Sequence, residues 1–187
     1  MQGDIERTLI PHQQIAQRVA ELAAMITADH SPPKLDGSAQ MTIVPVLTGA
    51  MIFCGDLIRQ VPLAMQIGLM TVTSYPGRSV TSQGAQVVAQ QLGDLRGRHV
   101  VLVDDILDSG QTVRLVQEVV RAQGADSVRT CVLLRKDRPA AHDVKVDYVG
   151  FDIPDVFVVG YGLDFNNYYR NLPDIVTLKA HVTERRA

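Results

Sequence analysis

The chain has 187 residues and a mass of 20.5 kDa, the size of one ordinary domain. Hydrophobic residues make up 46% of it and charged residues 20%, which excludes a chain that is disordered by composition. The formal net charge of −2 lacks the basic surplus of a general nucleic-acid binder. No apolar stretch approaches the roughly 20 residues that span a bilayer, and the first residues carry acids where a secretory signal is basic. We therefore expect a soluble cytoplasmic protein that makes no membrane contact, with Cys54 and Cys131 as buried thiols.

The hydrophobic pattern predicts an α/β fold. Helical spacing of apolar residues predicts helices over about 13–28, 50–60 and 112–123, and Gly124 is placed to end the last of them. Short apolar runs predict strands over 41–47, 67–73, 99–105, 127–134, 146–151 and 156–159. Apolar strands that alternate with helices indicate a mostly parallel sheet with helices on both faces. Since no repeat interrupts the pattern, we expect one domain whose terminal segments form a small subdomain.

Residues 74–94 differ in character from the rest of the chain. They are polar, rich in Gly, Ser and Gln, and carry few bulky apolar side chains. A stretch of this length with little structure often serves as a mobile lid, so we expect a lid over about 74–90. The alternative is a solvated hairpin with no role in function.

The clearest chemical pattern is VVLVDDILDSGQT, residues 100–112. Asp104 and Asp105 come at the end of a strand, and ligands of an open parallel sheet gather at that edge. Asp108 follows in a turn in which Gly110 precedes a helix, and a helix N-terminus can hold a phosphate. The adjoining carboxylates can accept hydrogen bonds from sugar hydroxyls or help to hold Mg²⁺. Helix capping alone explains one such acid but not three beside a Ser-Gly-x-Thr turn.

Other nucleotide and metal motifs are absent from the sequence. It has no GxxxxGK[ST] segment, which argues against a P-loop NTPase, and no GxGxxG after a strand. Its five histidines are scattered without the spacing of paired zinc ligands. We also find no Ser or Cys in the setting of a catalytic nucleophile.

Residues 100–112 resemble the phosphoribosyl pyrophosphate signature of the type I phosphoribosyltransferases. LLRKDRP (133–139) and GFDIPDVFVVGYGLDFNNYYRNLPDI (150–175) are similar to the purine-salvage branch, the hypoxanthine-guanine phosphoribosyltransferases. VPVLTGAMIF (44–53) and the Ser74-Tyr75 pair resemble the pyrophosphate loop and the mobile loop of that branch. The resemblance covers about 5–178 and implies the type I fold in a single domain over 1–187. The core would lie over about 40–160, and a hood would come from about 1–15 and 160–187.

The resemblance implies roles for the residues around the phosphoribosyl group. Asp104 and Asp105 would hold the ribose hydroxyls and organise Mg²⁺. Asp108 would face N7 of the purine as general base or acid. The 5′-phosphate would be held by Asp108, Ser109, Gly110, Gln111 and Thr112. Gln111 departs from the Lys or Arg often found in the family, which leaves backbone N–H groups and hydroxyls to bind the phosphate.

On the base side, the resemblance implies that Lys136 donates to the oxygen at C6 of the purine. Phe157 would stack on the base, a role that suits a flat apolar ring. Val158 would bind the base through backbone groups. Asp164, near the base, would bind Mg²⁺ on the pyrophosphate side, where Arg170 would reach the pyrophosphate.

The pyrophosphate loop would be Leu47, Thr48 and Gly49, in which the family can adopt a cis peptide bond. Thr48 stands where relatives often have Lys, so main-chain N–H groups would carry the binding, and Gly49 would supply the conformational freedom that the loop needs. Ser74 and Tyr75 would cap the site when the lid closes, because a reactive ribosyl centre must be shielded from water.

Together these features imply transfer of the phosphoribosyl group of phosphoribosyl pyrophosphate to N9 of hypoxanthine or guanine. The products would be IMP or GMP and pyrophosphate, with Mg²⁺ as cofactor, in a homodimer or homotetramer. One alternative is a xanthine-preferring transferase, and another is a nucleotide-sensing, RNA-binding regulator on the same fold. Asp108 and Lys136 together favour the enzyme, and the net charge of −2 gives RNA binding no support.

Overall fold

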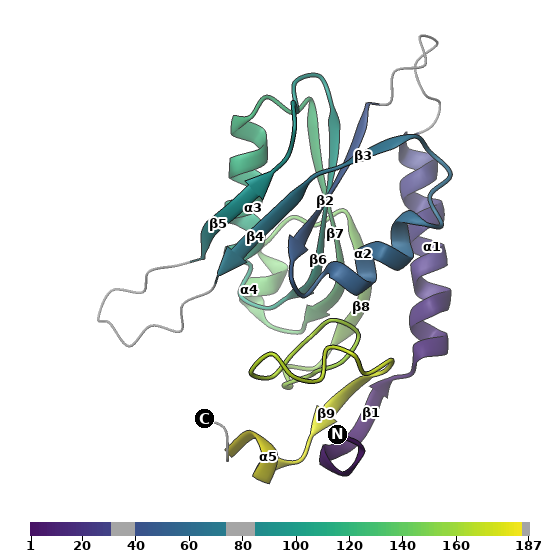
Figure 1. The fold of residues 1–187 in the computed structure, drawn as a ribbon, viewed down its shortest axis with the longest axis vertical. Helices are drawn as coiled ribbons and strands as arrows, with labels where there is room; N and C mark the ends of the chain where they lie inside the picture. The colour runs from purple at the N-terminus through teal and green to yellow at the C-terminus, as the bar shows by residue number, and fades with distance from the viewer. Residues whose placement is uncertain (31–39, 74–84, 185–187) are drawn as a thin grey trace, which may run out of the picture.

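The computed structural model describes residues 1–30, 40–73 and 85–184 (Figure 1). The helices are α1 (His12–His30), α2 (Met51–Ile58), α3 (Gln111–Ala122), α4 (Pro139–His142) and α5 (Ala180–Glu184), and a 3-10 turn spans Gln2–Asp4. The strands are β1 (Ile5–Ile10), β2 (Met41–Leu47), β3 (Met65–Ile67), β4 (Leu69–Thr73), β5 (Gln86–Gln91), β6 (His99–Leu107), β7 (Ser127–Lys136), β8 (Tyr148–Ile153) and β9 (Ile175–Leu178).

A central sheet carries the strands in the order β5-β4-β2-β6-β7-β8, and β3 also pairs with β2. Every pairing in this sheet is parallel except that of β4 with β5. The carboxyl ends of β2, β6, β7 and β8 therefore lie along one edge. Ligands of such sheets bind at that edge.

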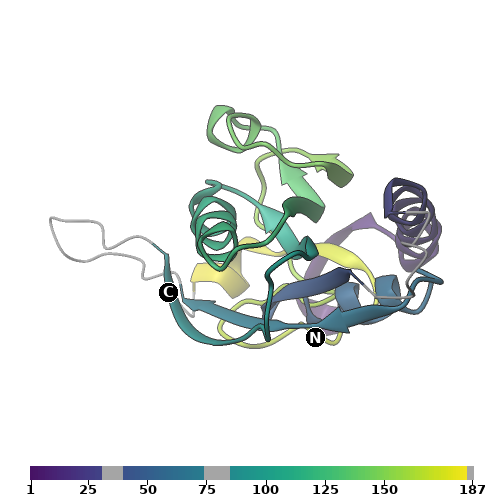
Figure 2. The same ribbon diagram turned by 90° about the horizontal axis from the view of Figure 1, so that it is seen from above.

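Helices cover both faces of the sheet, as the strand pattern predicts. Along β6, Val101 and Val103 pack in the core with α1 and α2, whereas Val100 and Leu102 pack with α3. This alternation follows from the two-residue period of a strand. Figures 1 and 2 show α1 and α2 on one side of the sheet and α3 and α4 on the other. Both cysteines are free and buried.

The two terminal segments meet in a separate two-stranded sheet. β1 pairs antiparallel with β9, so that Ile5 lies opposite Leu178 and Ile10 opposite Ile175. The chain between β8 and β9 lies between this small sheet and the carboxyl ends of the central strands (Figure 1). The small sheet thus stands over the edge at which a ligand of the central sheet would bind.

Several segments differ from the sequence-based expectation. The strand expected over 156–159 is wrong: β8 ends before Pro154, which has no N–H to donate, and only Val159 bridges to Val176. β1 and β9 were not expected, because exposed polar side chains of β1 interrupt its apolar pattern. The lid expected over about 74–90 is wrong at its end, since residues 86–90 belong to β5 and pair with β4. The rest of that segment, including Ser74 and Tyr75, lies outside the described residues.

In the described ranges, no helix combines the length and apolar character needed to cross a membrane.

Candidate active site

Two adjacent carboxylates lie in the last part of β6, which runs two residues further than expected. Asp104 is only 5% exposed, and its Oδ1 accepts a hydrogen bond of 3.0 Å from the backbone N–H of Asp105. Burial and the neighbouring charge of Asp105 raise the pKa of Asp104 well above its usual range. Burial also raises the pKa of Asp105, against hydrogen bonds and the charge of Arg170 that lower it. Buried acids of this kind are stabilised when a cation or a hydroxyl donor binds beside them.

This pair fits a hard divalent cation. Neither Asp104 nor Asp105 forms an ion pair within the described residues, so carboxylate oxygens remain for a ligand. Among the described residues there is no group of three or more His, Cys, Asp or Glu side chains arranged to hold a metal. Mg²⁺ commonly binds one or two carboxylates and completes its shell with water and substrate oxygens. A site in which water and substrate supply the other ligands needs only two carboxylates from the protein.

The turn between β6 and α3 presents a helix N-terminus. Gly110 is the N-cap, with a φ of +76° in the left-handed region. A Cβ at Gly110 would lie 2.2 Å from Cγ2 of Val144. The position therefore requires glycine both for its backbone conformation and for lack of space. No side chain caps α3 within the described residues, and first-turn N–H groups have no acceptor in their own helix. These N–H groups, with exposed Ser109 and half-buried Thr112, form an anion site at the edge of the sheet.

Four charged side chains form a closed ring beside that turn. Nζ of Lys136 lies 3.1 Å from Oδ2 of Asp108 and 3.2 Å from Oδ1 of Asp155. Arg138 pairs with the other oxygen of Asp108 and lies 3.3 Å, through Nε, from Oδ2 of Asp155. We call Asp108, Lys136, Arg138 and Asp155 the ion-pair ring. It brings the two predicted base-binding side chains within hydrogen-bond distance of each other.

The ring lowers the pKa of Asp108. Partial burial raises that pKa, but hydrogen bonds from Arg138 and Lys136 outweigh it and hold it below its usual range. Asp108 is therefore a carboxylate at neutral pH, the form that a proton acceptor requires. Lys136 is buried, so its ammonium depends on its carboxylate partners for solvation.

Phe157 lies in the segment after β8 and is exposed for an apolar residue. Its side chain is 50% exposed, and it forms a T-shaped pair with Phe165, with ring centroids 5.6 Å apart and planes at 79°. The exposed part of the ring is accessible to a ligand that stacks on it. Val158 next to it is buried, yet within the described residues no hydrogen bond uses its backbone N–H or carbonyl. These backbone groups remain available to a ligand.

Gly49, at the end of β2, packs directly against the acid pair. A Cβ at Gly49 would lie 1.9 Å from Oδ2 of Asp105. Its φ is outside the left-handed region, so glycine is needed here for space and not, as the sequence suggests, for conformational freedom. The peptide bond between Leu47 and Thr48 is cis, as the resemblance implies, and the Thr48 side chain is exposed.

Arg170 and Asp164 close the site from the segment that follows β8. Nη1 of Arg170 donates to the carbonyl of Gly162 at 2.7 Å, and Nη2 lies 2.7 Å from Oδ1 of Asp164. Gly162 in turn packs on the pyrophosphate loop, since its Cβ would lie 2.1 Å from the carbonyl oxygen of Gly49. Arg170 thus stands beside Gly49 and Asp105, with Asp164 fixing the direction of its guanidinium.

The structure brings the predicted residues into two neighbouring groups. One contains Asp108 and Lys136 in the ion-pair ring, and the other contains Gly49, Asp105 and Arg170. Sequence reasoning missed the other two ring members, Arg138 and Asp155. Arg138 follows the carboxyl end of the strand next to the one that ends in the acids, a signal that could have found it. Asp155 follows β8, two strands away from β6, and has no such signal.

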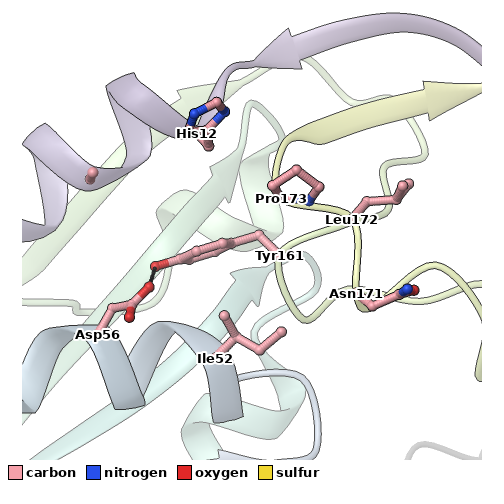
Figure 3. Close-up of a pocket in the computed structure, with 8 residues that line it drawn as sticks. His12, Ile52, Asp56, Tyr161, Asn171, Leu172 and Pro173 are labelled. Carbon is pink, nitrogen blue, oxygen red and sulfur yellow. Dashed lines mark hydrogen bonds between the residues drawn. The ribbon is translucent and has the colours of Figure 1, made fainter.

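A separate pocket of about 320 Å³ is lined by residues of α1, α2 and the segment between β8 and β9 (Figure 3). Within it the hydroxyl of Tyr161 donates a 2.6 Å hydrogen bond to Asp56 of α2. None of the predicted site residues lines this pocket, which is formed by His12, Ala16, Ile52, Asp56, Tyr161, Asn171, Leu172 and Pro173.

Known proteins match this chain in sequence and in fold. The family model for the phosphoribosyl transferase domain matches residues 7–166. The hypoxanthine-guanine phosphoribosyltransferase of Mycobacterium tuberculosis is 39% identical over 181 residues, which cover 96% of this chain and 89% of that protein. The hypoxanthine phosphoribosyltransferase of Salmonella typhimurium is 38% identical over 165 residues, covering 88% of this chain and 90% of that protein.

The crystal structure of a hypoxanthine phosphoribosyltransferase from Staphylococcus aureus superposes with a TM-score of 0.87. It is 32% identical in sequence, and the match covers 97% of this chain and 96% of that one. The domain model and these relatives define the class of protein, a glycosyltransferase that transfers phosphoribosyl groups. The chain belongs to the phosphoribosyltransferase family, in its hypoxanthine-guanine branch.

Proposed function

We propose that this protein transfers the phosphoribosyl group of phosphoribosyl pyrophosphate to N9 of hypoxanthine or guanine. The observation that carries the proposal is the 3.1 Å separation of Asp108 and Lys136. In a six-oxopurine, N7 and the oxygen at C6 are neighbouring atoms on one edge. An acceptor and a donor side by side match a protonated N7 and that oxygen, while the half-exposed ring of Phe157 suits stacking on the purine plane.

Asp108 moves the proton in this mechanism. As N9 attacks C1′ of the ribose, electron density leaves the imidazole ring and the N7 proton becomes acidic. The Asp108 carboxylate accepts that proton, and in the reverse reaction it returns it. Lys136 donates to the oxygen at C6, which orients the base, and the backbone of Val158 offers further hydrogen bonds at the base edge.

The first turn of α3 holds the 5′-phosphate through N–H groups of Gln111 and Thr112, with the Ser109 hydroxyl as a further donor. Asp104 and Asp105 bind the ribose hydroxyls and would hold Mg²⁺, which supplies charge neutralisation to the departing pyrophosphate. The main chain of Leu47 to Gly49 and the Arg170 side chain bind that pyrophosphate, with Asp164 beside them as a candidate Mg²⁺ ligand.

The domain organisation supports these roles. We propose that the β1–β9 sheet and the segment before it form a hood over a core that spans about 40–160. We also propose that the protein acts in the cytoplasm as a homodimer or a homotetramer, the assemblies implied by its resemblance to the family.

The reaction itself is the direct test. Purified protein is incubated with hypoxanthine, phosphoribosyl pyrophosphate and MgCl₂, and the products are separated and identified. We expect IMP and pyrophosphate in equal amounts, and loss of turnover when EDTA removes the metal. Undiminished IMP formation in EDTA would contradict the metal assignment, and no IMP at all would contradict the proposed reaction.

Arg138 gives the reaction a defined pH dependence. Asp108 must be ionised to accept the N7 proton, so turnover falls as the pH drops through its pKa. Arg138 lowers that pKa, and the Arg138→Gln variant should raise it. We expect the acidic side of the kcat/KM profile, which reports the unliganded protein, to move to higher pH in this variant.

The matched control is Arg135→Gln, which breaks the ion pair of Arg135 with Asp152 and leaves the ion-pair ring intact. Its acidic limb should coincide with that of the unchanged protein. An Arg138→Gln profile that also coincides would show that Arg138 does not tune Asp108.

A further inference from the structure

Asp155 stands in the ion-pair ring without a place in the mechanism above. The ring alternates strictly: each carboxylate gives one oxygen to Lys136 and the other to Arg138. Asp108 and Asp155 are thus equivalent partners of the same two cations. Only Asp108 has a task at the base edge, which leaves Asp155 to be explained.

The backbone holds Asp155 opposite Lys136. Lys136 is the last residue of β7 and lies in register with Ile153, the last residue of β8. The N–H of Asp137 donates to the carbonyl of Ile153 at 2.8 Å, which ties the two strand ends together. Asp155 follows after Pro154, whose carbonyl accepts a 2.8 Å hydrogen bond from Val156. The carboxylate is therefore presented by a fixed turn from the neighbouring strand.

The position of Asp155 matters because of the hydrogen bonds that the Lys136 ammonium group can donate. Lys136 has three N–H donors, of which the ring uses two. The third is free for an acceptor on a bound base. When Asp108 turns its oxygen to N7, it becomes a weaker partner for Lys136, and a buried ammonium needs a remaining carboxylate. In the ring, Asp155 is that carboxylate.

We propose that Asp155 is a positioning residue, which holds the Lys136 ammonium in place for the oxygen at C6 of the bound purine. This inference rests on the proposed function and deepens it, because it makes recognition of a six-oxo group depend on a residue that does not touch the base. Without Asp155, Lys136 falls back on Asp108. A six-oxopurine must then separate that pair, and Asp108 is less available to N7.

The test compares two nucleotides that differ at C6 and in the N1 proton that accompanies the C6 oxygen. IMP carries the oxygen, and purine riboside 5′-monophosphate carries a hydrogen there. In Asp155→Asn, calorimetry should show IMP binding weakened about tenfold, the size of one hydrogen bond to a charged group. Binding of purine riboside 5′-monophosphate should change by less than about twofold, since it has no acceptor for Lys136. Equal weakening of both nucleotides, or none for IMP, would overturn the inference.

Asp152→Asn is the matched control, with the same chemical change three residues earlier in the chain. Asp152 pairs with Arg135 outside the ring. The Asp152→Asn variant should bind both nucleotides with the affinities of the unchanged protein. The Asp155 side chain is 46% exposed, so asparagine fits there without a new buried group, and thermal melting verifies folding.

Steady-state kinetics separates positioning from general damage. In Asp155→Asn we expect the KM for hypoxanthine to rise about tenfold, with the KM for phosphoribosyl pyrophosphate and kcat within about threefold. A parallel rise of both KM values would indicate a structural role and overturn the inference. The two claims fail differently: no IMP from the unchanged protein refutes the proposed reaction, whereas IMP formation with equal kinetics in Asp155→Asn and Asp152→Asn refutes only the role of Asp155.

Discussion

Replacing Asp108 by Asn is expected to lower the turnover number by roughly 10²- to 10⁴-fold, the usual worth of a positioned general base. The amide keeps the size of the side chain but cannot take the N7 proton. Affinity for phosphoribosyl pyrophosphate should change much less, because the anion-binding turn relies on backbone N–H groups. Single-turnover kinetics with saturating substrates measures the chemical step directly.

Asp152→Asn again controls for the loss of one carboxylate at the same edge of the sheet, and its turnover should be normal. A near-native turnover of Asp108→Asn at neutral pH would remove Asp108 from the mechanism. The ion-pair ring would then serve only to bind the base.

The second large effect is expected at Gly49. A Cβ there would occupy the position of the Asp105 carboxylate, 1.9 Å from its Oδ2. In Gly49→Val, either the pyrophosphate loop or Asp105 must shift, and both belong to the site. We expect binding of pyrophosphate and of phosphoribosyl pyrophosphate to weaken about 100-fold or more, equivalent to losing two or more hydrogen bonds to charged groups. Calorimetry measures both affinities, after circular dichroism has shown that the variant folds.

The adjacent Thr48→Ala variant is the natural control, because the Thr48 side chain is exposed and only its main chain is assigned a role. Its affinities should stay within about threefold of the unchanged protein, as for an ordinary surface substitution. If Thr48→Ala loses most of its affinity for pyrophosphate while Gly49→Val binds normally, the main-chain account of pyrophosphate binding is wrong.

Much of the fold could be predicted from the sequence because its strands are buried on both faces. Such strands appear as continuous apolar runs, and β2 was bounded correctly at both ends. β1 and β9 could not be found this way, since each forms only by pairing with a segment more than 160 residues away. The prediction of a strand over 156–159 is wrong because an apolar run does not always indicate a strand. Residues of this run are buried in the core, but they do not pair with the central sheet.

For the site, sequence motifs predict residue types but not their partners. Asp108 and Lys136 were singled out, yet their mutual contact through the ring depends on the adjacent order of β6, β7 and β8. That order also brings in Asp155, which carries no local signal of its own. Gly49 was predicted for its flexibility, and only the fold reveals that the Asp105 carboxylate takes the space of its missing side chain.

The most direct measurement is a competition among bases. Hypoxanthine, guanine, xanthine and adenine are supplied together at equal concentration, with limiting phosphoribosyl pyrophosphate and excess MgCl₂, and the nucleotides formed are quantified. The donor of Lys136 beside the acceptor of Asp108 predicts that IMP and GMP account for most of the product, with AMP at trace level. Predominance of XMP would identify a xanthine-preferring transferase. Predominance of AMP would contradict the central assignment, because a six-amino group offers the Lys136 ammonium no acceptor.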